Sequence, residues 1–78
     1  MNTTELNVAM VRKNVTANDM ALAIRKSHVS FNKKRSGEIA FDANEIMALS
    51  TALSLTLQQV NVIFFDNILP DGNFTSKM

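Results

Sequence analysis

Apolar residues recur three and four positions apart in five short stretches of the chain, which is the spacing of one buried face of an α-helix. The expected buried positions are Leu6, Ala9 and Met10; Met20, Ala21 and Ile24; Phe31; Ile46, Leu49, Ala52 and Leu53; and Leu57, Val60, Ile63 and Phe64. This pattern predicts an all-α fold, a compact domain of five short helices.

The residues that precede these stretches are typical helix caps, because a hydroxyl or carboxylate oxygen accepts a hydrogen bond from a free amide of the first turn. The expected caps are Thr4, Thr16, Ser27, Asp42 and Thr56. Asp19 follows Thr16 by three positions as an imperfect capping box, and Glu45 follows Asp42 in the same way. Phe41, before its cap, is expected to staple onto Ile46. The third helix is expected from His28 to about Ser36, where Gly37 is placed to end it in the left-handed conformation.

The chain of 78 residues predicts one domain, residues 1–72, followed by a loosely held, flexible tail at 73–78. Leu69-Pro70-Asp71-Gly72 is expected to form a turn between the two. No stretch approaches the roughly 18 apolar residues of a membrane span, and no signal peptide is recognisable. We therefore expect a soluble, cytoplasmic protein.

The inventory of reactive residues argues against an enzyme. The chain has no cysteine, one histidine (His28) and two glycines (Gly37 and Gly72). This set excludes a disulfide framework, a thiolate metal site and a glycine-rich phosphate loop. We expect no catalysis, no metal, no cofactor and no small-molecule substrate.

Charge is distributed unevenly along the chain. Residues 12–35 hold seven bases against one acid, a net charge of +6, whereas residues 36–78 hold one base against five acids, a net charge of −4. A basic block ahead of an apolar, acidic half suggests that one face meets a polyanion and that another supplies the core or meets a protein partner.

The second and third stretches, residues 16–24 and 27–37, resemble the helix-turn-helix of the lambda-repressor and Cro type, the XRE family. Met20, Ala21, Ile24 and Phe31 match buried positions of that motif, Asn14-Val15-Thr16 looks like its Gly-Leu-Thr lead-in, and Ser36-Gly37 looks like the end of its recognition helix. The resemblance covers roughly residues 4–66, and Phe64-Phe65 before a proline resembles small phage regulators of the lysis/lysogeny switch in particular.

Three basic residues depart from the family pattern. Arg25 stands where the turn usually has Gly, Lys26 where the next residue is usually apolar, and Lys34 where the third helix is commonly buried. We expect an extended or distorted turn, in which the stems of Lys26 and Lys34 cover core edges while their ammonium groups reach solvent or phosphate.

The resemblance implies that the third helix enters the major groove of double-stranded DNA. Residues expected to face base edges are His28, Val29, Asn32 and Lys33; residues expected to hold phosphates are Thr16, Ser27, Arg25, Lys26, Lys34 and Arg35. Three consecutive cations cannot all point one way, so at most two of residues 33–35 are expected at the DNA. Val29 has an alternative place in the core, where it would replace the apolar contact that Lys26 gave up.

The apolar cluster of residues 60–69 is too continuous for one helical stripe. One side is expected in the core, and the other needs cover from a dimer mate or a second regulator. The expected protein interface is Ile63, Phe64, Phe65, Ile68 and Leu69.

Two functions are consistent with these predictions. The first is a Cro-like transcription regulator that binds, as a homodimer, an operator of two related half-sites. The second is an antirepressor that keeps the fold but docks on a partner phage repressor and blocks or alters its DNA binding.

Overall fold

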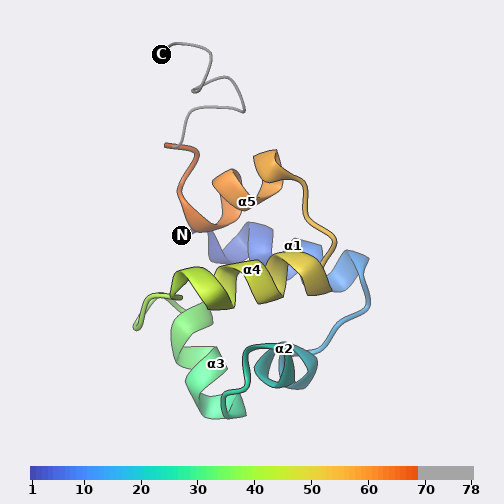
Figure 1. The fold of residues 1–78 in the computed structure, drawn as a ribbon, viewed down its shortest axis with the longest axis vertical. Helices are drawn as coiled ribbons and strands as arrows, with labels where there is room; N and C mark the ends of the chain where they lie inside the picture. The colour runs from blue at the N-terminus through green and yellow to red at the C-terminus, as the bar shows by residue number, and fades with distance from the viewer. Residues whose placement is uncertain (69–78) are drawn as a thin grey trace.

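The computed structural model describes residues 1–68, and within them the fold is all-α. Its five helices, shown in Figure 1, are α1 (Thr3–Arg12), α2 (Ala17–Ile24), α3 (His28–Arg35), α4 (Ala43–Ala52) and α5 (Leu57–Phe64). The predicted five-helix architecture is therefore confirmed. The predicted turn at 69–72 and the predicted tail at 73–78 lie outside the described residues, so the domain boundary at residue 72 stays a prediction.

Four of the five helices begin directly after the capping residue that the sequence predicts. Thr16, Ser27, Asp42 and Thr56 each accept a hydrogen bond from the backbone N–H three residues on. Capping boxes close at the starts of α2, α4 and α5, so the box at Thr16 and Asp19 is complete. Thr4 is wrong as the first cap. Asn2 takes that role, because its side-chain oxygen accepts from the Glu5 N–H at 3.0 Å, and the helix starts two residues earlier than a Thr4 cap implies.

The turn between α2 and α3 is short and closed. Arg25 adopts a left-handed conformation (φ 59°), and its N–H donates to the Leu22 carbonyl while the Lys26 N–H donates to the Ala21 carbonyl. These two bonds form a Schellman motif, the common ending of a helix. The prediction of an extended or distorted turn is therefore wrong, because Arg25 itself takes the left-handed conformation that glycine adopts most readily. Gly37 (φ 89°) ends α3 in the left-handed region, as predicted.

The core is built by one face of every helix. Its fully buried centre consists of Leu6, Met20, Phe31 and Leu49. Phe41 lies in the loop before α4, with its ring centroid 6.1 Å from that of Phe31 and 5.7 Å from that of Phe64, so it joins α3 to α5 through aromatic contacts.

Two expected core positions are exposed. Ala52 faces solvent because Leu53, the next residue, takes the inward place at the end of α4. Leu57 is the first residue of α5 and lies ahead of the buried stripe that Ile63 and Phe64 form.

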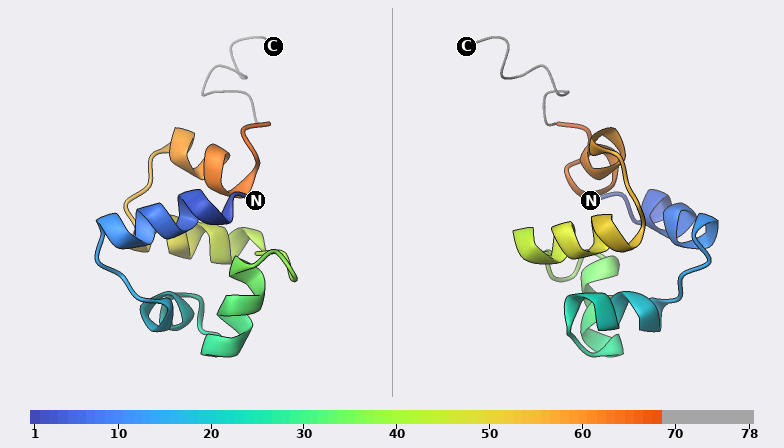
Figure 2. Two further views of the ribbon diagram at one scale, coloured as in Figure 1. Left: turned by 180° about the vertical axis from the view of Figure 1, so that it is seen from behind. Right: turned by 45° about the vertical axis from the view of Figure 1, so that its right-hand side comes forward.

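The helices are arranged so that the turn between α2 and α3 lies at one end of the molecule. Figures 1 and 2 show α2 and the start of α3 at the end opposite α5, with α1 and α4 between them. α2 packs on both α3 and α4, and α1 packs on α5. Within residues 1–68, no helix has the length and apolar character needed to cross a membrane.

Candidate nucleic-acid interface

One face of α3 is turned away from the core. Phe31 is fully buried, and Val29, whose side chain lies about 200° around the helix from it, is 65% exposed. His28 and Lys33 are exposed on the same outward side, and Asn32 is partly exposed at its edge. The alternative that places Val29 in the core is therefore wrong, and the four residues predicted to face bases share one surface.

Exposed cations and a helix start flank this face. Arg25 and Lys26 are exposed in the turn immediately before α3. Ser27 caps α3 by accepting from the Ser30 N–H at 3.0 Å, which leaves its hydroxyl proton free to donate to an acceptor outside the protein. Arg25, Lys26 and Ser27 therefore lie together at the start of α3, an arrangement of cations and a free hydroxyl that suits an anion.

Thr16, predicted as a second phosphate ligand, lies beside a carboxylate. The Thr16 N–H donates to Asp19 Oδ2 at 2.9 Å, and the Asp19 N–H donates to Thr16 Oγ1 at 3.1 Å. The hydrogen bond from the Thr16 backbone, followed by the side-chain bond with the same residue, lowers the pKa of Asp19 and keeps the carboxylate ionised. Thr16 can offer a phosphate its hydroxyl proton, but its own N–H is occupied and a negative charge stands next to it.

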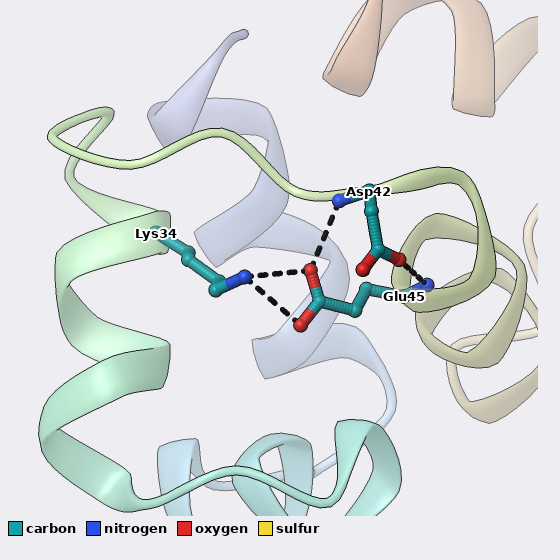
Figure 3. A network of polar contacts seen from close by, with 3 residues as sticks. All are labelled: Lys34, Asp42 and Glu45. Atoms are coloured by element: carbon teal, nitrogen blue, oxygen red, sulfur yellow. Dashed lines mark hydrogen bonds and ion pairs between the residues drawn. The ribbon is translucent and has the colours of Figure 1, made fainter.

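Lys34 is wrong as a phosphate ligand. Its Nζ lies 2.7 Å from Glu45 Oε1 and 2.9 Å from Oε2, and the two side chains are only 12% and 5% exposed. Glu45 also closes the capping box of α4, because its Oε1 accepts from the Asp42 N–H at 2.9 Å, as Figure 3 shows. Lys34 lies on the inward side of α3, so its ammonium group meets α4 and is withdrawn from the outward face.

Arg35 is also held within the protein. Its Nη2 donates to Asn32 Oδ1 at 2.8 Å, and its guanidinium carbon lies 5.6 Å from the centroid of the Phe31 ring. Its backbone carbonyl accepts from Thr3 Oγ1 at 2.7 Å, which ties the end of α3 to the start of α1. The structure thus brings Arg35 onto Asn32 and gives its guanidinium an intramolecular partner in place of the predicted phosphate.

Glu45 and Thr3 are partners of α3 that the sequence does not predict. The signal for Glu45 was indirect: a lysine at a commonly buried position requires an acid nearby, but five acids follow Ser36 and spacing alone does not choose among them. Thr3 carried no signal, since its contact joins residues 32 positions apart.

The predicted carboxy-terminal interface is largely internal. Ile63 and Phe64 are wrong as interface residues because both are buried in the core of this chain, where the Ile63 carbonyl also accepts from the Asn2 N–H at 2.7 Å. Phe65 is partly buried and Ile68 is exposed. Leu69 lies outside the described residues.

No group of three or more acidic, histidine or cysteine side chains in residues 1–68 is placed to hold a metal ion. Comparison of the chain with protein-family models, with curated proteins and with solved structures found no match.

Proposed function

We propose that the chain is a transcription regulator of the lambda-repressor and Cro type, which binds operator DNA by placing α3 in the major groove. The observation that carries the proposal is the outward face of α3, where Val29 is 65% exposed among polar and basic neighbours while Phe31 anchors the opposite side in the core. The diameter of an α-helix with its side chains matches the width of the major groove, so α3 fits there.

Each side chain on this face has a chemical task at a base edge. The methyl groups of Val29 suit the 5-methyl group of thymine, and Lys33 can donate to the O6 and N7 acceptors of guanine. Asn32 can pair with adenine through both ends of its amide, and His28 can donate or accept at the edge of the face. Together these groups suit both A·T and G·C pairs, whereas a purely basic face would favour guanine alone.

Phosphate contacts would come from the turn. Arg25 and Lys26 are exposed cations, and Ser27 adds a hydroxyl proton and the free amides of the α3 start. The slope of log K against log salt concentration is negative, and each cation that neutralises a phosphate adds about 0.9 to its magnitude. Binding would therefore weaken steeply with salt, and removal of either cation would reduce the slope.

The operator would consist of two related half-sites about one helical turn apart, read by two copies of the chain in the bacterial cytoplasm. Phe65 and Ile68 are the members of the predicted carboxy-terminal interface that remain at the surface of the described chain. They support contact between copies, because covering apolar side chains at the surface removes apolar area from water.

Selection of bound duplexes from a random DNA pool, by the purified protein at near-physiological salt, tests this function. Enrichment of a short site is expected. Failure to enrich any sequence, with residual binding that disappears as salt rises, would contradict it and would turn attention to the antirepressor alternative, in which the chain binds a repressor protein.

A further inference from the structure

We infer that Arg35 is a positioning residue that fixes the side-chain amide of Asn32 for reading adenine; this inference rests on the proposed function. Three polar side chains lie in a row along α3. Arg35 Nη2 is 2.8 Å from Asn32 Oδ1, and Asn32 Nδ2 is 3.4 Å from His28 Nε2. Residues three and four apart are neighbours on one side of a helix, so the row follows the helix axis.

The hydrogen-bonding chemistry of the row leaves one orientation for the amide. A guanidinium has only donors, so the group that faces Arg35 must be the oxygen of Asn32 and not its nitrogen. The nitrogen then points toward His28, where it can only donate. His28 Nε2 must therefore accept, which places the proton of a neutral imidazole on Nδ1. Rotating the amide by half a turn would set donor against donor at Arg35.

Arg35 is itself held in place. Its guanidinium lies 5.6 Å from the centroid of the Phe31 ring, and Phe31 is fully buried. Its carbonyl is bonded to Thr3 on α1. A planar guanidinium on an aromatic ring gains cation–π attraction and keeps its donors in a fixed plane. The amide of Asn32 is thus oriented by a group that the core immobilises.

An amide held in this way still has the groups that adenine needs. Asn32 Oδ1 has a second lone pair, and Nδ2 has a second hydrogen, after the bonds to Arg35 and His28 are made. Adenine offers a donor at N6 and an acceptor at N7 in the major groove, which match that pair. Fixing the amide before binding removes the cost of ordering it and excludes the flipped amide.

The test compares Arg35→Met with Lys26→Met on the duplex that the wild-type protein selects. Methionine keeps an apolar stem on Phe31 and removes the donor. The base pair that faces Asn32 is identified first, as the position at which Asn32→Ala loses preference. We expect Arg35→Met to reduce the preference for adenine there at least about fivefold, the lower end of what a paired amide contact discriminates. The slope of log K against log salt should remain as in the wild type.

Lys26→Met is the matched control, because it also removes one cation. It should lower the salt slope by about 0.9 and keep the adenine preference. A lower slope with unchanged preference for Arg35→Met would overturn the inference, since that result describes a phosphate ligand. If the wild-type protein selects no site, the proposed function and the inference both fail; if it selects one and Arg35→Met keeps the full preference, the inference alone fails.

A measurement without DNA gives a second readout. The side-chain NH₂ resonances of Asn32 in the free protein should move in Arg35→Met and in Arg35→Lys, but not in Lys26→Met. Arg35→Lys also serves if the methionine variant does not fold, because it keeps the charge and loses the planar fork. Asn32 resonances that are unchanged in the Arg35 variants would overturn the inference.

Discussion

The ammonium group of Lys34 is bonded to both carboxylate oxygens of Glu45, at 2.7 and 2.9 Å, and the pair is almost withdrawn from solvent. Because Glu45 also caps α4 through the Asp42 N–H, a single carboxylate joins the end of α3 to the start of α4. The pair therefore fixes the orientation of α3 relative to the rest of the domain.

Lys34→Met should destabilise the fold by about 3–5 kcal/mol, because it leaves a buried carboxylate without its cation. The double variant Lys34→Met/Glu45→Gln should recover most of that loss, since glutamine can still accept from the Asp42 N–H without carrying a charge. Urea unfolding measures both. Lys13→Met removes an exposed cation and should stay within about 0.5 kcal/mol of the wild type. A single Lys34 variant as stable as the Lys13 variant would refute the structural role.

Arg25→Gly should stabilise the protein by about 1 kcal/mol, because Arg25 has φ 59° and glycine adopts this left-handed conformation without steric cost. The same change should lower the salt slope of DNA binding by about 0.9, because it removes a phosphate-directed cation. Arg25→Ala is the control: it should lower the slope equally without the gain in stability. Equal unfolding free energies for the glycine and alanine variants would show that the turn carries no strain.

Asp19→Asn should lower stability at neutral pH and change it little in strong acid. The hydrogen bond from the Thr16 backbone holds the pKa of folded Asp19 below its ordinary value of 3.8, so the charged form favours folding. This contribution is present above pH 3.8 and is lost as pH falls through the lower folded pKa. Urea unfolding of both proteins at pH 7 and near pH 2 measures it. Glu38→Gln, which changes an exposed acid outside the helix caps, should show no such pH dependence of the stability difference from the wild type. If Asp19→Asn is as destabilised near pH 2 as at pH 7, the Asp19 carboxylate charge is not the cause.

If Val29 contacts a thymine as proposed, replacing that thymine by uracil in the selected duplex should weaken binding by the wild-type protein severalfold, because the 5-methyl group is lost. The Val29→Ala variant should be less sensitive to the same replacement. Fluorescence anisotropy with the two duplexes measures this, and Val11→Ala, an exposed valine on α1, is the matched control. If uracil lowers the affinity of the wild type and of Val29→Ala equally at every thymine, Val29 does not contact a methyl group.

The five helices and most of their caps were predictable because their signals are local. Each cap, such as Thr16 or Asp42, bonds to a residue three positions away, and the apolar period shows which side faces inward. Thr4 was the exception, since two polar residues precede it and either Asn2 or Thr3 could also begin a helix.

Whether a basic side chain of α3 is exposed or paired depends on partners that the local sequence does not show. Lys33, Lys34 and Arg35 are consecutive and chemically alike in the sequence. Lys33 is exposed, Lys34 pairs with Glu45, and Arg35 donates a hydrogen bond to Asn32. Which partner a buried lysine finds is fixed by the packing of α3 on α4, which no local pattern reports. Burial of Ile63 and Phe64 inside this chain is not predictable for a similar reason: an apolar run shows that burial is needed but not whether this chain or another supplies it.

Base reading by α3 is best tested by determining the enriched DNA motif for the wild-type protein and for Asn32→Ala side by side. We expect a two-fold symmetric motif for the wild type. The variant should lose preference at one base pair in each half-site and retain the rest. Identical motifs from the two proteins, or no motif from the wild type, would contradict base reading by α3.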